Sequence, residues 1–182
     1  MFSNKIDPRT FSRKVNLILV VSVYRGGVIN QEYNFSYIPE DLKHLKEITK
    51  NQIVVMERKT HEAIIRKIGG PLPERKTVIL TDDKNYHFAN GNCQVISENP
   101  LNKVLEIAKH KKVFVIGEGK TYKLFMPFST KIIANYLDLE LQGEDIFPEV
   151  GDEWEILSQE KNHCPRSKVN FQQVTYIRES RT

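Results

Sequence analysis

Short apolar runs rich in β-branched residues recur along this chain and constrain its fold more than any other feature. They read VNLILVVSV, IVVM, TVIL and VFVI, at residues 15–23, 53–56, 77–80 and 113–116. Each run presents apolar residues on both faces of an extended segment, as strands buried inside a parallel sheet do. We therefore expect a sheet whose central strands are covered by helices on both sides.

Helical patterns separate these strands. Leu42, Leu45 and Ile48 recur at helical spacing after Pro39, which predicts a helix from about residue 40 to Thr49. Further helices are expected at residues 60–68, 100–110 and from about 120, and further strands at 94–96, 131–141 and on both sides of a long polar connection between 154 and 178. This order predicts a single α/β domain with a mixed, mostly parallel sheet, flanked by helices and ending in an antiparallel C-terminal edge.

Composition narrows the class of protein. The 182 residues are 40% hydrophobic and 27% charged, and no apolar run approaches the length that a bilayer requires, so membrane insertion is not expected. The net charge of +4 is small and scattered, so nucleic-acid binding is not expected, whereas an anionic small ligand is compatible. Cys93 and Cys164 lack the spacing of a metal site, which indicates a reducing compartment and no bound metal.

Residues 1–14 form a basic N-terminal extension, and residues 15–182 the folded domain. The extension carries hydroxyl residues and a single acid. Two interpretations stand: a remnant of a mitochondrial targeting segment, or a solvated arm that contacts protein partners. The expected location is accordingly the cytoplasm or the mitochondrial matrix.

The run at 113–116 ends at Gly117 and is followed by Gly119 and a helical segment. A strand, a tight turn and a helix N-terminus in this order bring unpaired backbone N–H groups together, and such junctions bind phosphates. The alternative is that the two glycines only allow a sharp turn.

Six segments carry a resemblance to a known family. They are Val28-Ile29, residues 39–42 (PEDL), 55–60 (VMERKT), 70–76 (GPLPERK), 115–122 (VIGEGKTY) and Phe147-Pro148. In this order and spacing, the chain from Asn16 to Arg178 resembles dihydrofolate reductase. The resemblance implies the dihydrofolate reductase-like fold and the reduction of 7,8-dihydrofolate to tetrahydrofolate by hydride transfer from NADPH.

The resemblance also implies a substrate site. Asp41 falls on the acidic pocket residue that accepts two hydrogen bonds from the amino-pyrimidine edge and supports protonation. Tyr37 is the second catalytic candidate, placed to hold an ordered water. Arg75 falls on the arginine that binds the glutamate carboxylate of folate, and Leu42 and Leu72 fall on substrate contacts.

For the cofactor, the resemblance implies phosphate contacts, a glycine turn and a residue near the nicotinamide. The phosphate contacts are Arg58, Thr60, Thr81 and Lys120. The glycine turn is formed by Gly117 and Gly119, and Tyr122 is the residue near the nicotinamide.

Three acids depart from the family pattern. Glu57 and Glu118 stand where the family has glycine, and Asp82 lies close to the expected place of the cofactor's 2′-phosphate. A carboxylate a few ångströms from a phosphate costs on the order of 1–4 kcal/mol. We therefore expect these acids to weaken cofactor binding.

Two functions from different classes remain open. The first is a divergent, working dihydrofolate reductase. The alternative is a catalytically inactive subunit that keeps the fold and serves as a scaffold in a larger assembly, held partly by residues 1–14. Reduction of another heterocycle is a third option, with no residue specifically in its support.

Overall fold

The computed structural model describes residues 15–29 and 39–178, and for residues 39–42 it describes the backbone alone. The predicted N-terminal arm and Tyr37 lie outside the described residues. The side chains of Asp41 and Leu42 do so as well.

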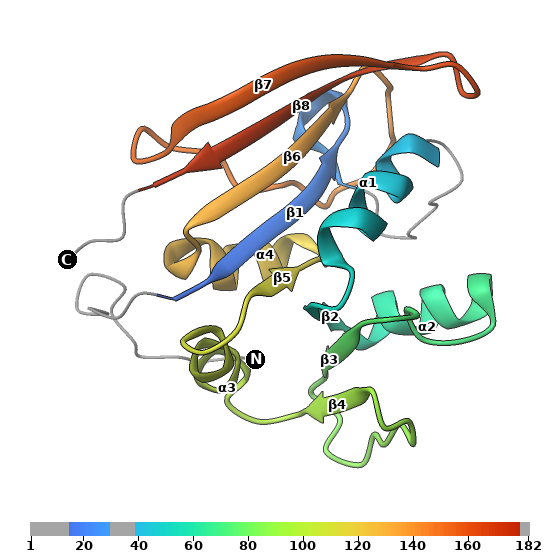
Figure 1. Cartoon of the computed structure of the whole chain (residues 1–182), viewed down its shortest axis with the longest axis vertical. Coiled ribbons are helices and arrows are strands. Elements are labelled where there is room, and N and C mark those ends of the chain that lie inside the picture. The colour runs from blue at the N-terminus through green and yellow to red at the C-terminus, as the bar shows by residue number, and fades with distance from the viewer. Residues whose placement is uncertain (1–14, 30–38, 179–182) are drawn as a thin grey trace.

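A single eight-stranded sheet forms the centre of the molecule, in the order β4-β3-β2-β5-β1-β6-β8-β7 (Figure 1). The strands are β1 (Leu17–Val23), β2 (Ile53–Glu57), β3 (Lys76–Leu80), β4 (Cys93–Ile96), β5 (Val113–Val115), β6 (Lys131–Leu137), β7 (Glu155–Cys164) and β8 (Val169–Ile177). Strands β1 to β6 pair in parallel, whereas β8 runs antiparallel to β6 and β7 antiparallel to β8. The predicted mixed sheet with an antiparallel C-terminal edge is confirmed.

Helices cover both faces of the parallel part of the sheet. They are α1 (Pro39–Thr49), α2 (Arg58–Ile68), α3 (Pro100–Ala108) and α4 (Gly119–Phe125), with short 3-10 turns η1 (Arg25–Gly27) and η2 (Met126–Phe128). Apolar residues of α1 and α2 pack with alternate residues of β1 such as Ile18 and Val20. Residues of α3 and α4 pack with the intervening residues, such as Leu17 and Leu19. Both faces of β1 are therefore buried, as its apolar sequence predicted.

Some predicted boundaries were wrong. Helix α2 begins two residues earlier than expected, α3 ends at Ala108 and β6 ends at Leu137. The long polar connection expected between 154 and 178 is instead β7, a ten-residue strand, followed by only four residues before β8. Residues 155–163 of β7 are all exposed, because this strand lies at the sheet edge and has no helix over it. Polar residues in such a strand resemble a loop in sequence.

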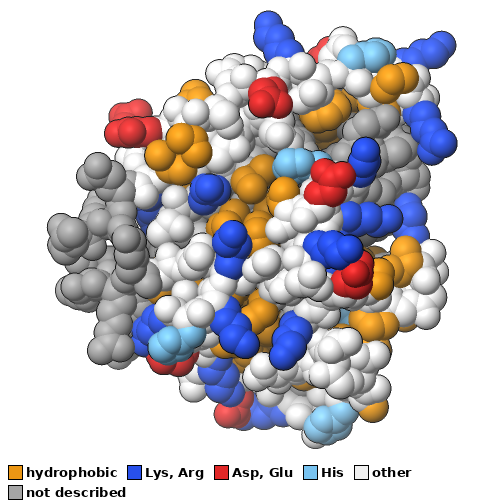
Figure 2. Space-filling view, in the orientation of Figure 1, with side chains coloured by type: hydrophobic (Ala, Val, Ile, Leu, Met, Phe, Trp, Pro, Cys, Tyr) orange, Lys and Arg blue, Asp and Glu red, His pale blue; other side chains and the backbone are white. Residues whose placement is uncertain are grey.

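Charge is distributed without a dominant patch on the face shown in Figure 2. Lys and Arg side chains are spread over this face, with Asp and Glu side chains among them. Within the described ranges, no helix is long and apolar enough to cross a membrane, and no group of His, Cys, Asp and Glu residues could hold a metal ion.

Candidate functional site

Three neighbouring parallel strands, β3, β2 and β5, end at one edge of the sheet. Arg58 and Thr60 follow β2, Thr81 follows β3, and the turn from Gly117 leads from β5 into α4. In open parallel sheets, ligands bind outside the carboxyl ends of the strands. The fold thus gathers at one edge the residues predicted for the cofactor: Arg58, Thr60, Thr81, Gly117, Gly119, Lys120 and Tyr122.

An ion pair joins the end of β2 to the start of α4. The Glu57 side chain is 7% exposed, and its Oε2 lies 2.9 Å from the Nζ of Lys120, while its Oε1 accepts a hydrogen bond from the Thr121 hydroxyl. Burial opposes the charge of Lys120, but the hydrogen bond and charge of Glu57, together with Glu118 and Asp82, raise the pKa of this amine. Glu57 is therefore a buried carboxylate whose charge is compensated by Lys120.

Glu118 lies in the turn itself, between β5 and α4, and is half-buried. Burial raises the pKa of its carboxyl, and the nearby Glu57 and Asp145 carboxylates raise it further against the opposing effect of Lys120 and Lys59. Glu118 is the acid in this turn whose negative charge is poorly compensated.

The two glycines of the turn have different roles. The N–H of Gly117 donates to the Tyr122 hydroxyl at 3.1 Å, and that hydroxyl donates to the carbonyl of Val20 at 2.8 Å. The N–H of Gly119 donates to Asp145 Oδ2 at 2.8 Å. A Cβ on Gly119 would overlap Asp145 Oδ1 and lie 3.0 Å from a backbone carbonyl oxygen, so only glycine fits there. Both of these amides already have protein acceptors.

Tyr122, predicted to lie near the nicotinamide, is buried at the base of the turn. Its ring packs edge-on against Phe147 at 5.1 Å between centroids, and its hydroxyl joins the turn to β1. The geometry gives Tyr122 a positioning role for the glycine turn.

Arg58 begins α2 but is not a free cation. Its Nε lies 2.7 Å from Glu62, one nitrogen of the guanidinium lies 3.0 Å from Asp83, and the guanidinium carbon lies 4.2 Å from the centroid of the Tyr86 ring. The hydrogen bond with Glu62 is the largest of the effects that raise the pKa of Arg58. A phosphate at this arginine must compete with two carboxylates.

Two threonines lie beside Arg58. The Thr60 hydroxyl is fully buried in the first turn of α2 and has no hydrogen-bond partner among the described residues. The Thr81 hydroxyl accepts the N–H of Asp83 at 3.1 Å, which fixes the turn after β3. Thr60 therefore offers an unused donor at the N-terminus of α2, where an anion is favoured by the helix dipole.

Arg75 lies away from this edge, just before β3. It donates to the Thr49 hydroxyl at 3.1 Å, to the Pro73 carbonyl at 2.5 Å and to the Lys46 carbonyl at 2.6 Å. Burial lowers the pKa of Arg75, although the charge of Glu74 opposes this. These bonds use three of the five guanidinium N–H groups, so two have no acceptor within the described part of the chain, although the residue as a whole is only 7% exposed.

The substrate candidates Asp41 and Leu42 belong to the first turn of α1. Only residues 50–52 connect the end of α1 to the start of β2, so α1 runs against the strands and begins near their carboxyl ends. Leu72 packs with Leu45 of α1 in the apolar cluster that includes Val20. The loop that carries Leu72 and Arg75 therefore lies against α1.

Several residues of this edge were missed by the sequence analysis: Glu62, Asp83, Tyr86, Thr121 and Asp145. The four-residue spacing of Arg58 and Glu62 on a helix was a usable signal, because side chains so spaced are neighbours. Asp145 gave no such signal, since it lies 26 residues from its partner Gly119.

Comparisons with known proteins agree on one family. The family model described as dihydrofolate reductase matches residues 16–178. Dihydrofolate reductase HdrB of Haloferax volcanii is 34% identical over 140 residues, which cover 74% of this chain and 72% of the relative. Dihydrofolate reductase of Staphylococcus haemolyticus is 27% identical over 150 residues, covering 81% and 86%.

A solved structure supports the fold. Dihydrofolate reductase from Enterococcus faecalis, complexed with NADP(H) and RAB-propyl, superposes with a TM-score of 0.76 at 24% identity and covers 90% of this chain and 96% of its own. These relatives are named as reductases, so the comparisons give the scaffold alternative no support.

Proposed function

We propose that this chain, which belongs to the dihydrofolate reductase family, reduces 7,8-dihydrofolate to tetrahydrofolate with a hydride from NADPH. One observation supports this most strongly. The match spans residues 16–178, and the residues predicted for the cofactor meet at the carboxyl edge of β3, β2 and β5.

The cofactor side of this edge fits a bound diphosphate. The buried Thr60 hydroxyl lacks a protein partner and lies at the N-terminus of an eleven-residue helix. NADPH, when bound, supplies the hydride. Thr60 and the first amides of α2 hold its phosphates, while Gly119 keeps the neighbouring turn compact against Asp145.

The acids that depart from the family pattern weaken cofactor binding less than uncompensated charges would. The charge of Glu57 is matched by Lys120 and its second oxygen by Thr121. Glu118, with its raised pKa, is more easily protonated than an ordinary glutamate. Cofactor binding is therefore weakened mainly by Glu118, and the site remains usable.

On the substrate side, Asp41 accepts two hydrogen bonds from the amino-pyrimidine edge of the pterin and orients the ring for protonation. Asp41 belongs to the first turn of α1, at the positive end of the helix dipole. Tyr37 holds the water that approaches the ring. Arg75 uses its two remaining N–H groups for the substrate's carboxylate, and Leu42 and Leu72 contact its apolar middle.

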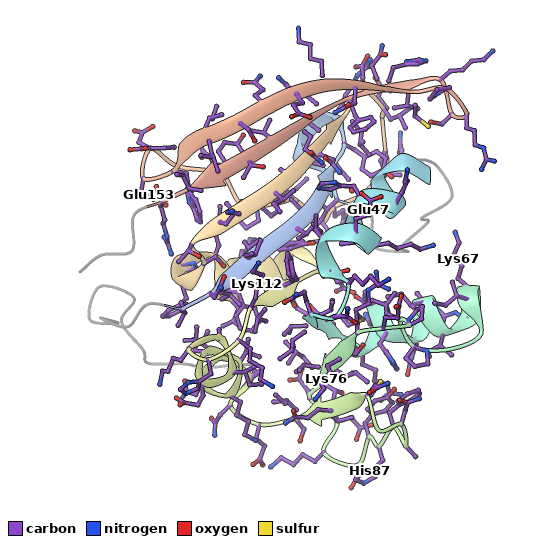
Figure 3. All side chains as sticks on the ribbon, viewed as in Figure 1. Glu47, Lys67, Lys76, His87, Lys112 and Glu153 are labelled. Carbon is purple, nitrogen blue, oxygen red and sulfur yellow. The ribbon has the colours of Figure 1, made fainter. Side chains whose placement is uncertain are left out.

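The test is turnover of dihydrofolate with NADPH, combined with titration of NADPH by fluorescence. Asp41→Asn should lower kcat by about 10²-fold or more while leaving the Kd of NADPH within about twofold, because only the proton-handling carboxylate changes. The matched control is Glu47→Gln on the exposed part of the same helix, α1 (Figure 3), which should retain turnover. An unchanged rate in Asp41→Asn removes Asp41 from its role. The absence of NADPH saturation up to millimolar concentration rejects the proposal.

A further inference from the structure

The unit β2-α2-β3 carries an arginine where α2 begins and two acids after its second strand. The N-terminus of α2 follows β2, and Asp82 and Asp83 follow the next parallel strand, with Asp83 25 residues beyond Arg58. In βαβ units that bind dinucleotides, an acid about 20 residues after the phosphate-binding turn hydrogen-bonds the ribose 2′-hydroxyl of NAD, whereas an available arginine accommodates the 2′-phosphate of NADP.

Here the arginine of this unit is already paired, because two of its five N–H groups bind carboxylates. Glu62 and Asp83 bind the guanidinium of Arg58 at 2.7 and 3.0 Å, and the Tyr86 ring covers its face at 4.2 Å. Asp83 is itself held in place, because its N–H donates to Thr81 and its Oδ1 accepts the N–H of Asn85. The pairing of Arg58 with Asp83 is therefore built into the turn after β3.

The charges around this turn do not favour a further anion. Asp82 is exposed beside Asp83, and Glu62 lies on the next turn of α2. Lys59, the other cation at the start of α2, acts on the carboxyl of Glu118, which lies on the β5 side of β2 and thus away from β3. Two further cations lie near these acids, but both are paired: Lys84 with Glu98 at 2.6 Å and Lys120 with Glu57 at 2.9 Å. A 2′-phosphate, which carries up to two negative charges, would therefore meet three carboxylates and cations that already have acidic partners.

We propose that the cofactor site does not select for the 2′-phosphate, so that NADH serves as a hydride donor with an efficiency within tenfold of that of NADPH. This inference rests on the proposed reductase function. The ribose 2′-hydroxyl of NADH donates a hydrogen bond to a carboxylate after β3, whereas the 2′-phosphate of NADPH must compete with Asp83 for Arg58.

The first test compares kcat/KM for the two donors in the reduction of dihydrofolate by the full chain. A ratio of NADPH to NADH below ten supports the inference, and a ratio above ten overturns it. Asp83→Asn should raise this ratio about tenfold, because it removes one negative charge near the 2′-phosphate and keeps the oxygen that accepts the Asn85 N–H.

Asp138→Asn is the matched control. Asp138 forms a similar pair with Arg25, at 2.6 Å, but follows β6, four strands away from β3. This variant should leave the ratio of the two donors unchanged. Circular dichroism of each variant checks that the fold is retained.

A binding measurement separates failure of this inference from failure of the reductase function. Calorimetry compares adenosine 2′,5′-bisphosphate with 5′-AMP, and their Kd values should agree within tenfold. If both nucleotides bind with similar Kd values but neither donor reduces dihydrofolate, the reductase function fails, whereas the part of the inference that concerns binding, the lack of selection for the 2′-phosphate, stands. If the bisphosphate binds more than tenfold tighter, the inference fails whatever the turnover. If neither nucleotide binds and neither donor reduces dihydrofolate, the inference and the reductase function are both rejected.

Discussion

Gly119 is the position at the candidate site where a single added methyl group has the clearest consequence. Its N–H donates to Asp145, and a Cβ would overlap the same carboxylate and crowd the Ile146 carbonyl oxygen. Gly119→Ala should therefore lower the free energy of unfolding by about 1–3 kcal/mol, the usual cost of overpacking. Chemical denaturation measures this. Gly91→Ala, where nothing lies within 4 Å of the added atom, should change it by less than about 0.5 kcal/mol.

Lys120 compensates the buried charge of Glu57, and this pair gives a second test. Lys120→Met leaves the carboxylate without its cation and should cost about 1–2 kcal/mol of stability. This is less than the loss of about 3–5 kcal/mol at a fully buried pair, because the Lys120 side chain is 61% exposed. Adding Glu57→Gln should recover part of the loss, whereas strictly additive losses would show that the pair has no coupling. Lys123→Met, exposed on the same helix, is the control.

The same pair shows what sequence alone predicts at a single residue. The sequence marks Glu57 as a departure from the family pattern and Lys120 as a phosphate contact, but it does not show that the two side chains pair. Their contact depends on the register in which Val55 of β2 lies beside Val115 of β5. Side chains 63 positions apart in sequence meet only through that pairing. Residue type and position were therefore predictable, while the compensation of Glu57 was not.

At the scale of the elements, the turn between β5 and α4 should respond to pH through Glu118. The pKa of the Glu118 carboxyl is raised in the folded protein above its ordinary value of 4.5. Deprotonation of Glu118 therefore costs more in the folded than in the unfolded protein, and the fold loses stability as the pH rises from 4.5 through the raised pKa. Glu118→Gln removes this effect. The variant should be more stable than the parent chain at pH 7, by up to about 1 kcal/mol, and the difference should disappear below pH 4.5.

Denaturation curves at a series of pH values measure this difference. Glu153→Gln is the control, since Glu153 is exposed and lies at the other end of the sheet from α2 (Figure 3). A stability gain that is the same at pH 4 and pH 7 would mean that Glu118 does not act through its charge. The affinity for NADPH should follow the same trend, rising in the parent chain as Glu118 becomes protonated.

The elements themselves were predictable to different degrees. The apolar strands β1, β2, β3 and β5 were placed within about two residues, because burial on both faces leaves a clear signal. The antiparallel hairpin of β7 and β8 was predicted, but the length of β7 was not, because an edge strand needs only backbone pairing with its neighbour and tolerates polar residues throughout. The register shift after Ile156 weakens the alternating pattern further.

At the scale of the whole molecule, the order of the strands creates the candidate site. Strand β5 inserts between β2 and β1, so the turn at Gly117 lies next to the start of α2 although some 60 residues separate them. Neither periodicity nor composition specifies this order; the family resemblance supplied it, and the structure confirms the fold. Neither the sequence patterns nor the family resemblance shows how the charges at this edge pair with one another.

Cofactor binding should therefore stabilise the whole chain, since it joins β3, β2 and β5 through one ligand. At a hundred times its Kd, a ligand that binds only the folded state adds about 2.7 kcal/mol, which for a chain of this size raises Tm by roughly 5–10 °C. NADPH and NADH should each produce this shift in a thermal unfolding scan, and Lys120→Met should not abolish it. Sodium pyrophosphate at equal ionic strength controls for general anion effects and should produce a much smaller shift. A Tm that does not move at millimolar NADPH would contradict the placement of a dinucleotide at this edge.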